Sequence, residues 1–497
     1  MSPPASAKND AVSRVVQMDT LAPDTSEKDV QPNVIDFNSK KRSLFQWYHP
    51  DDGPVERKLI LKLDLSVLVF ACFGFWCLYI DRGMFINAYI SGMREDLGFL
   101  GNELVQLNSI FTVGYAISII PLTVINTRLP PRQVIPICMA IWAIFTTLLT
   151  RANSYGEVAA YRFLVGFAEG AFFPSIHYVF GSWYRPDEIA RRAGLFYVSA
   201  AIGTFSTGFL AARIYADLDG AMGRAGWRWM FLVGGVVCLP VAIFGYITFP
   251  GTPSHATRWL FTESELALSR ARMEAVGRKP NQAVALKLSS IKRFLGGWHF
   301  WVLVPWSVIF QQGYLVMPQG TWALWIKSNK QYSGVTVNNL TAVAPCVAIV
   351  WSIAFSWISD RYGPKSRLPL FAFAHLTMGL GHLAFVLYDS SPFGYKWFAV
   401  AVGQVENSMA PIMYSCANLI CANDAEERAF ILSAMLAFAM AFNSWVPIVL
   451  LPTTEAPRFF KGYLAGLIAQ PLSFALAVLV YYLDKDGRRP RGQKTAL

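Results

Sequence analysis

Apolar residues gather in long runs along this chain, and polar residues gather between those runs. An α-helix needs roughly 17 to 25 apolar residues to cross the hydrocarbon of a membrane. A backbone in hydrocarbon must also satisfy its own hydrogen bonds, so each such run predicts a helix. The pattern therefore predicts an all-α membrane protein with twelve transmembrane helices, at 65–86, 106–126, 133–150, 158–181, 194–212, 229–249, 300–318, 337–358, 368–388, 397–421, 429–451 and 463–483.

A polar stretch between the sixth and seventh runs divides the spans into two groups of six. Within it, Thr262 and Glu265 predict a capping box at the start of a charged helix. We expect a cytoplasmic surface helix that joins two six-helix bundles, although a plain linker fits the same residues. The expected parts are a disordered cytoplasmic tail (1–60), a six-helix bundle (61–250), a cytoplasmic central loop with a surface helix (251–298), a second six-helix bundle (299–484) and a cytoplasmic C-terminal tail (485–497).

The seventh span differs from the others because Pro305, Gly313 and Pro318 interrupt it. Interruptions of this kind are tolerated where a helix lines a polar cavity. We therefore expect the seventh span to border a pathway.

The composition agrees with a membrane protein, since 54% of the residues are hydrophobic and 15% are charged. Soluble domains carry about 25% charged residues. The net charge of +11 does not point to nucleic acid, because the basic residues lie beside the spans. The seven cysteines lack metal-ligand spacing, so no metal or other cofactor is expected.

The distribution of Lys and Arg predicts how the spans are oriented. These residues concentrate in the tails and in alternate loops, which places both termini in the cytoplasm. The first 60 or so residues lack the apolar region of a signal peptide, so the first span must itself enter the membrane. We expect a multi-pass protein of the plasma membrane, with the vacuole and the peroxisome left open.

Two charged residues lie inside the fourth span. Arg162 and Glu169 are seven residues apart, which places them on one face of a helix, two turns apart. Gly166 and Gly170 between and beside them allow a neighbouring helix to approach closely. A lone charge at the centre of a membrane helix costs roughly 2.5–3.5 kcal/mol on insertion scales. The pair therefore indicates a transport pathway, or else an internal ion pair that only holds helices together.

Asp81 and Arg82 end the first span. Neighbouring residues on a helix point about 100° apart, so these two side chains are expected to have different partners. An ordinary polar helix end at the interface is the alternative. Glu406 in the tenth span is either a structural acid or a second proton site, and His375 and His382 share a face of the ninth span.

A loop after the eighth span, residues 356–367 (SWISDRYGPKSR), resembles the loop signature G-x-x-x-D-R-x-G-x-R/K-R/K of the major facilitator superfamily, with Ser356 in place of the first glycine. The corresponding loop of the first half, 124–132, lacks the acidic residue. The series R-x-x-x-G-x-x-x-G from Arg162 to Gly170 also matches that superfamily. The resemblance implies the major facilitator fold and an inner-gate latch built from Asp360, Arg361, Gly363, Lys365 and Arg367.

The charged residues of spans one and four narrow this resemblance to the anion:cation symporter branch. Segments 87–97 (NAYISGMREDL), 423–429 (NDAEERA) and 456–462 (APRFFKG) resemble its fungal allantoate permease and pantothenate transporter members. The resemblance covers roughly residues 60–485. By this resemblance Arg82 and Arg162 serve the anionic substrate or the gate, Asp81 and Glu169 serve proton coupling, and Gln311 or Gln312 with Asn443 completes the substrate site.

Tyr79 and Tyr115 are further candidates for contact with substrate, because each is an aromatic hydroxyl near the charged residues in sequence or in the next span. The seventh span lacks the arginine that some animal members carry, which fits a monocarboxylate or an amide-bearing anion.

These residues and the resemblance together predict a secondary transporter that couples protons to the symport of a small organic anion, such as the vitamin pantothenate, by alternating access. The first alternative is an exporter on the same fold. The second, which the sequence favours less, is a non-transporting nutrient sensor. No Walker sequence and no nucleophile–base set is visible, so neither an ATP-driven pump nor an enzyme is expected. The expected partners are the anion, protons and the lipid bilayer, with the protein acting as a monomer.

Overall fold

The computed structural model describes residues 47–49, 52–253, 256, 260–275, 288–316, 320–421 and 425–486, and within these ranges every regular element is a helix. Contacts divide the chain into two units, Met1–Lys58 and Leu59–Leu497. The tail expected to be disordered over 1–60 is helical from Pro54, where α2 begins, and the disorder expected for residues 1–46 falls outside the described part. All features discussed below belong to the second unit.

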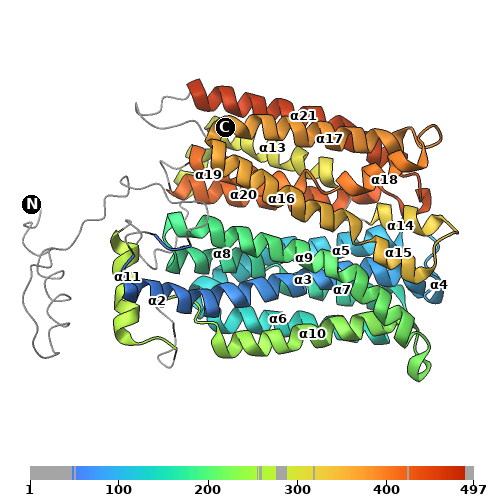
Figure 1. The fold of residues 1–497 in the computed structure, drawn as a ribbon, viewed down its shortest axis with the longest axis horizontal. Helices are drawn as coiled ribbons and strands as arrows, with labels where there is room; N and C mark the ends of the chain where they lie inside the picture. Colours follow the sequence, from blue (N-terminus) through green and yellow to red (C-terminus); the bar gives the residue numbers. More distant parts are fainter. Residues whose placement is uncertain are drawn as a thin grey trace, which may run out of the picture. The chain divides into compact units, whose positions relative to one another are not determined.

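The first half of the chain forms a set of long helices (Figure 1). Two π-helical turns, Asp64–Leu68 and Tyr89–Met93, join the first three of them into one helical stretch. Two 3-10 turns, Leu149–Arg151 and Ala221–Gly223, follow later. The helices are α2 (Pro54–Leu63), α3 (Val69–Ala88), α4 (Arg94–Asp96), α5 (Glu103–Arg128), α6 (Pro131–Leu148), α7 (Tyr155–Glu169), α8 (Phe172–Trp183), α9 (Pro186–Leu218) and α10 (Gly226–Thr248).

The second half has shorter helices and more breaks. Its 3-10 turns are Gly363–Ser366, Asn407–Met409 and Thr453–Glu455. The helices are α11 (Glu263–Ala275), α12 (Leu288–Leu295), α13 (Trp298–Tyr314), α14 (Thr321–Ser328), α15 (Gly334–Leu340), α16 (Val343–Tyr362), α17 (Arg367–Val386), α18 (Phe393–Val402), α19 (Ala410–Ile420), α20 (Ala425–Leu450) and α21 (Phe460–Asp486).

Nine helical stretches among the described residues are long and apolar enough to cross a membrane. The prediction of an all-α membrane protein is therefore confirmed. The three other predicted spans take different forms. α5 covers the second with 26 residues, α13 covers most of the seventh with 17 residues, and the tenth is divided between α18 and α19.

The seventh and the tenth predicted spans contain breaks in the helix. α13 runs through Pro305 and ends at Tyr314, so the expected interruption lies at the Gly313 end of the span. α18 ends at Val402, and the chain turns through residues 403–406 before a 3-10 turn leads into α19. Non-helical backbone at membrane depth is stable only where protein or a polar cavity surrounds it.

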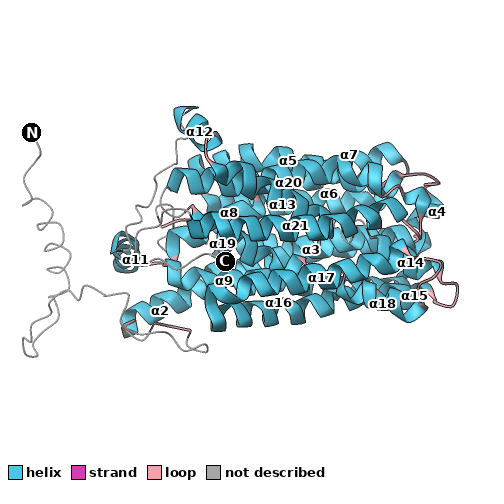
Figure 2. Cartoon of the chain, turned by 90° about the horizontal axis from the view of Figure 1, so that it is seen from above, coloured by secondary structure: helices cyan, strands magenta, loops and turns pink. Residues whose placement is uncertain are grey.

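Helices of the two halves pack side by side, as Figures 1 and 2 show. α9 contacts α15 and α16, and α5 contacts α20. One apolar cluster is confined to the second half, with Trp306, Phe371 and Met413 among its members. A second cluster joins both halves, since it holds Phe85 as well as Trp325.

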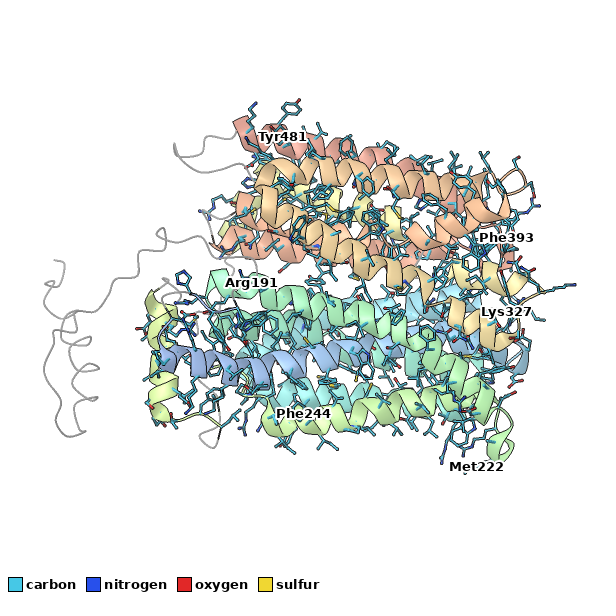
Figure 3. All side chains as sticks on the ribbon, in the orientation of Figure 1. Arg191, Met222, Phe244, Lys327, Phe393 and Tyr481 are labelled. Atoms are coloured by element: carbon cyan, nitrogen blue, oxygen red, sulfur yellow. The ribbon has the colours of Figure 1, made fainter. Side chains whose placement is uncertain are left out.

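The described side-chain bonds between the halves gather at one end of the helices, the end at which Lys327 is labelled in Figure 3. There Asn338 Nδ2 donates to Ser91 Oγ at 3.0 Å, with both residues buried. Lys327 Nζ pairs with Glu95 Oε1 at 3.0 Å. A Cβ atom on Gly208 would lie 2.7 Å from the carbonyl oxygen of Asn338. We call this set of contacts the end seal.

The helix of the central loop, α11, is docked by charged side chains. The capping box is present, because Thr262 N donates to Glu265 Oε2 at 2.9 Å and Glu265 N donates to Thr262 Oγ1 at 3.3 Å. Lys62 Nζ also donates to Glu265 Oε2, at 2.7 Å. Arg272 Nη2 donates to the buried Glu188 Oε1 at 2.6 Å. The helix therefore contacts α2 and α9 through ion pairs.

Candidate functional site

The fourth predicted span is divided between α7 and α8, and Gly166 in α7 and Gly170 at its C-terminal end let α5 come into backbone contact. A Cβ atom on Gly166 would overlap the carbonyl oxygen of Phe111. A Cβ atom on Gly170 would lie 2.6 Å from the carbonyl oxygen of Tyr115. The close approach predicted for this glycine pair is confirmed, and it brings the side chains of α5 beside Arg162 and Glu169.

Glu169 is paired with Arg82 of α3. Arg82 Nε donates to Glu169 Oε2 at 3.0 Å, and the Glu169 side chain is 0% exposed while that of Arg82 is 30% exposed. A buried carboxylate needs such a charged donor, because water does not reach it. The cation that balances Glu169 therefore comes from another helix, while its own helix supplies Arg162 for a different contact.

Asp81, the neighbour of Arg82, is bonded to α6. Thr146 Oγ1 donates to Asp81 Oδ1 at 2.8 Å, and Asp81 is 2% exposed. The two adjacent residues thus have different partners, as their angular separation on the helix predicts. The alternative of an ordinary polar helix end is wrong, since Asp81 is buried among polar side chains of other helices.

The carboxyl groups of Asp81 and Glu169 also lie within hydrogen-bonding reach of each other. Asp81 Oδ2 and Glu169 Oε1 each lack a donor among the described residues. Two buried carboxylates at this separation repel each other unless one proton lies between them. The geometry therefore makes this carboxyl pair a place where a proton can bind.

Arg162 occupies the buried side of the same site, with 3% of its surface exposed. Its Nη2 atom donates to Asn108 Oδ1 of α5 at 3.4 Å. Its guanidinium carbon lies 4.1 Å from the ring centre of Phe85 and 4.3 Å from that of Phe111. Aromatic faces stabilise a desolvated guanidinium, so Arg162 keeps its charge without contacting solvent.

Arg82 has an aromatic environment of its own. Its guanidinium carbon lies 5.5 Å from the ring centre of Tyr79, 5.1 Å from that of Phe111 and 5.0 Å from that of Tyr115. The tyrosine hydroxyls leave polar groups beside the partly exposed arginine. The two predicted tyrosines are therefore brought together with Arg82.

The predicted residues of spans seven and eleven form a pair. Gln312 Nε2 of α13 donates to Asn443 Oδ1 of α20 at 2.9 Å. Gln312 Oε1 has no donor among the described residues. Gln311 is the partly buried neighbour of Gln312. This amide pair contains a buried acceptor that no described donor satisfies.

The residues of the predicted latch are described only in part. The side chains of Asp360 and Arg361 lie outside the described part of the structure, and Gly363 begins the 3-10 turn Gly363–Ser366. Lys365 is exposed in the 3-10 turn before α17. Arg367 Nη1 lies 3.7 Å from Cys416 Sγ of α19. The latch itself stays a prediction.

Three side chains of the site were not among the sequence candidates. Asn108 and Thr146 are polar residues inside apolar spans, and this signal alone could have selected them. Phe111 lies close to both arginines. The chain has 36 phenylalanines, and nothing in the sequence distinguishes Phe111 from the others. Among the described residues, no three His, Cys, Asp or Glu side chains form a metal-binding group.

Comparison with known protein families matches residues 71–449 to the Major Facilitator Superfamily. The chain is 32% identical to the pantothenate transporter FEN2 of Saccharomyces cerevisiae over 435 residues, covering 86% of this chain and 83% of the relative. It is 30% identical to the vitamin H transporter of the same yeast over 470 residues, covering 92% and 78%. The pantothenate transporter liz1 of Schizosaccharomyces pombe is 29% identical, covering 88% and 84%.

Solved structures with the same fold include a bacterial homologue of the human lysosomal transporter Spinster, with a TM-score of 0.61, 15% identity and coverage of 86% of this chain and 98% of that one. A D-xylose–proton symporter also has a TM-score of 0.61, with 16% identity and coverage of 82% and 97%. Similarity at this level of identity concerns the fold alone.

Proposed function

Because this chain belongs to the Major Facilitator Superfamily, we propose that it is a secondary transporter that couples protons to the symport of a small organic anion, a vitamin or carboxylate such as pantothenate. The resemblance to fungal pantothenate transporters is confirmed by relatives that match most of the chain. Membership of this family makes the protein a multi-pass membrane transporter and not an enzyme.

The observation that carries the proposal is the carboxyl pair of Asp81 and Glu169 beside two arginines. Both acids are at most 2% exposed, and one carboxyl oxygen of each lacks a donor among the described residues. One proton between them removes the repulsion. Such a pair takes up one proton at a defined place, which is the property that a proton-coupled transporter requires.

The charge of the site supports symport with an anion. Two ionised acids and two arginines cancel, whereas the same four groups with one bound proton carry a single positive charge. One substrate carboxylate neutralises that charge. The protonated site therefore attracts a monoanion, and the deprotonated site releases it, so binding of one ligand favours binding of the other.

Arg82 is the group that we assign to the substrate carboxylate, because 30% of its side chain is exposed and Tyr79 and Tyr115 flank it. A carboxylate that binds Arg82 competes with Glu169 for the same guanidinium. Glu169, relieved of that partner, binds a proton more readily. Arg162 is buried. We assign it the role of keeping a positive charge in the site without contacting the substrate.

The names of the relatives support the proposed substrate class. They are named as transporters of pantothenate and vitamin H, and each of these vitamins carries one carboxylate with amide or ureido groups. The unused acceptor of Gln312, paired with Asn443, suits an amide-bearing substrate. We therefore assign these two residues, with Gln311, to the part of the substrate away from its carboxylate.

Alternating access fits the end seal. We propose that two six-helix bundles, 61–250 and 299–484, rock about the site. We also propose that the protein is a monomer in the plasma membrane and that both of its termini lie in the cytoplasm. Contacts such as that between Ser91 and Asn338 close one end in this state. Asp360, Arg361, Gly363, Lys365 and Arg367 are assigned to a latch that closes the other end in the alternate state.

The test is uptake of labelled pantothenate and biotin by proteoliposomes under an imposed pH gradient, with and without a protonophore. Glu169→Gln is expected to abolish accumulation against a gradient while retaining exchange of labelled for unlabelled vitamin. Glu157→Gln is the matched control, since Glu157 is an exposed acid at the start of the same helix. Protonophore-sensitive accumulation by Glu169→Gln would overturn the coupling role.

A further inference from the structure

The second half contains a buried acid that the site above does not use. Glu406 lies in the turn between α18 and the 3-10 turn Asn407–Met409 and is 0% exposed. Gln470 Nε2 of α21 donates to Glu406 Oε2 at 2.8 Å. Glu406 Oε1 lacks a donor among the described residues. A single neutral amide does not balance a full negative charge in a dry interior.

The helices around Glu406 supply few charges. From α17, His375 Nδ1 lies 3.6 Å from Glu406 Oε1. The same nitrogen donates to Gln470 Oε1 at 2.7 Å, which assigns the imidazole proton to that bond. From α13, the titratable neighbour is Tyr314. No Lys or Arg pairs with Glu406 among the ion pairs of the described residues.

The other contacts of this turn are neutral. Ser352 of α16 donates to Ser408 at 2.9 Å, and Ser408 donates to the carbonyl oxygen of Ala348 at 3.2 Å. His382 lies on α17, seven residues after His375. Its Nδ1 atom is bonded to the carbonyl oxygen of Met378 at 2.7 Å. Binding a proton at Glu406 Oε1 is therefore the change that removes the uncompensated charge.

Gly313 connects this acid to the break in α13. A Cβ atom there would lie 2.8 Å from Glu406 Oε1 and 2.6 Å from Gln470 Nε2. Gln470 Nε2 also lies 3.3 Å from the Gly313 carbonyl oxygen, to which it donates. α13 ends at the next residue, Tyr314. The acid thus lies where two discontinuous spans meet, the arrangement in which transporters place their ion sites.

We propose that Glu406, Gln470 and His375 form a second proton-binding site, in the second half of the chain, that holds one proton in the closed packing of these helices and exchanges it with water when the two breaks open. The proton forms an O–H bond at Glu406 Oε1 and returns to water as that bond breaks. This site is independent of the carboxyl pair of Asp81 and Glu169.

The test is infrared difference spectroscopy of the full chain in lipid, which detects the carbonyl stretch of a protonated carboxylic acid. Between about pH 5 and about pH 9 the wild-type band is expected to decline reversibly. Glu406→Gln is expected to remove that component. Glu427→Gln is the matched control, because Glu427 also pairs with a histidine, His299 at 2.7 Å, but its side chain is 19% exposed. The control is expected to leave the band in place.

A Glu406→Gln spectrum that keeps the full band overturns the proposal, since the wild-type acid is then ionised. A Glu406 band that does not change over this pH range also overturns it, because the acid is then a fixed structural group. If Glu406→Gln does not fold, Gln470→Met serves instead. Removing the amide donor is expected to shift the Glu406 band to higher frequency, and an unshifted band contradicts the site.

The spectrum reports on Glu406 without any transported substrate. A failure of the vitamin uptake assay therefore leaves this test intact, and a missing Glu406 band leaves the uptake assay intact.

Discussion

Arg82 Nε donates a 3.0 Å hydrogen bond to Glu169 Oε2, and this bond joins two helices across 87 residues of sequence. The acid is fully buried while the arginine is 30% exposed. The positive partner of the buried acid is thus the group that a solute can reach. Any anion that binds Arg82 changes the electrostatic environment of Glu169 directly.

Replacing this arginine is expected to stop transport. Arg82→Gln removes the exposed cation and leaves Glu169 without its donor, and loss of one partner of a buried charge pair costs about 2–5 kcal/mol. The initial rate of labelled pantothenate uptake should fall by at least about tenfold, since about 1.4 kcal/mol corresponds to a factor of ten. Arg82→Lys keeps the charge and should retain part of the rate.

Arg213→Gln is the control for that series. Arg213 pairs with Asp217 at 2.6 Å, but its side chain is 78% exposed, and exposed pairs contribute about 0–1 kcal/mol. Uptake by this variant should equal that of the wild type. An active Arg82→Gln protein, present in the membrane in normal amount, would contradict the assigned role.

The glycine contact between α7 and α5 predicts a stability effect. A methyl group on Gly166 meets the carbonyl oxygen of Phe111, and overpacking of this kind costs about 1–3 kcal/mol. Gly166→Ala should lower the unfolding temperature of the purified protein in detergent. Gly156→Ala lies on the same helix with nothing within 4 Å of the added Cβ, so its unfolding temperature should not fall. Equal unfolding temperatures for both variants would show that the helices separate easily.

Transport should require the two halves to separate at the end seal. Ser91 and Asn338 are joined by a 3.0 Å bond between opposite halves, so Ser91→Cys with Asn338→Cys, in a chain without its native cysteines, should form a disulfide on oxidation. That bond should abolish uptake, and a reductant should restore it. Either single cysteine serves as the control. Transport that continues with a complete cross-link would exclude the separation of the halves at this end.

The docking of α11 should depend on pH through Glu265. Burial raises the pKa of this carboxyl, but the Lys62 ammonium and the bonds from Thr262 together outweigh that effect, so the pKa lies below its usual value. A lowered pKa stabilises the docked state above the ordinary value of about 4.3, and the stabilisation is lost as pH falls through the lowered pKa. Amide hydrogen exchange of α11 should therefore accelerate below about pH 4, after correction for intrinsic rates.

Glu265→Gln should show the faster exchange at neutral pH and little further change on acidification. Glu274→Gln is the control, because Glu274 is an exposed acid on the same helix. Exchange in the wild type that is independent of pH would mean that contacts other than those of Glu265 dock the helix.

The sequence predicted the elements of the site better than their pairing. Helical periodicity correctly placed Arg162 and Glu169 on one face, where they contact Phe85 and Arg82 of α3. The angle between adjacent residues correctly separated the partners of Asp81 and Arg82. The sequence could not show that Arg82, and not Arg162, pairs with Glu169, because that pairing depends on the distance between α3 and α7. Helix packing sets that distance, and a single sequence does not contain it.

The second half was less predictable for the same reason. Glu406, His375 and Gln470 lie on three separate segments, and their sequence positions give no sign that they meet. The tenth span also appeared as one apolar run, although the chain turns at residues 403–406. Hydropathy averages over a window of residues, so it does not detect a break around one buried polar group.

Phe111 belongs at once to the packing of the helices and to the charges of the site. Its carbonyl oxygen contacts Gly166, and its ring lies 5.1 Å from the Arg82 guanidinium and 4.3 Å from that of Arg162. The contact that holds α5 against α7 therefore also fixes an aromatic face beside both guanidinium groups. An uncharged residue thus ties the spacing of two helices to the electrostatic environment of the two cations.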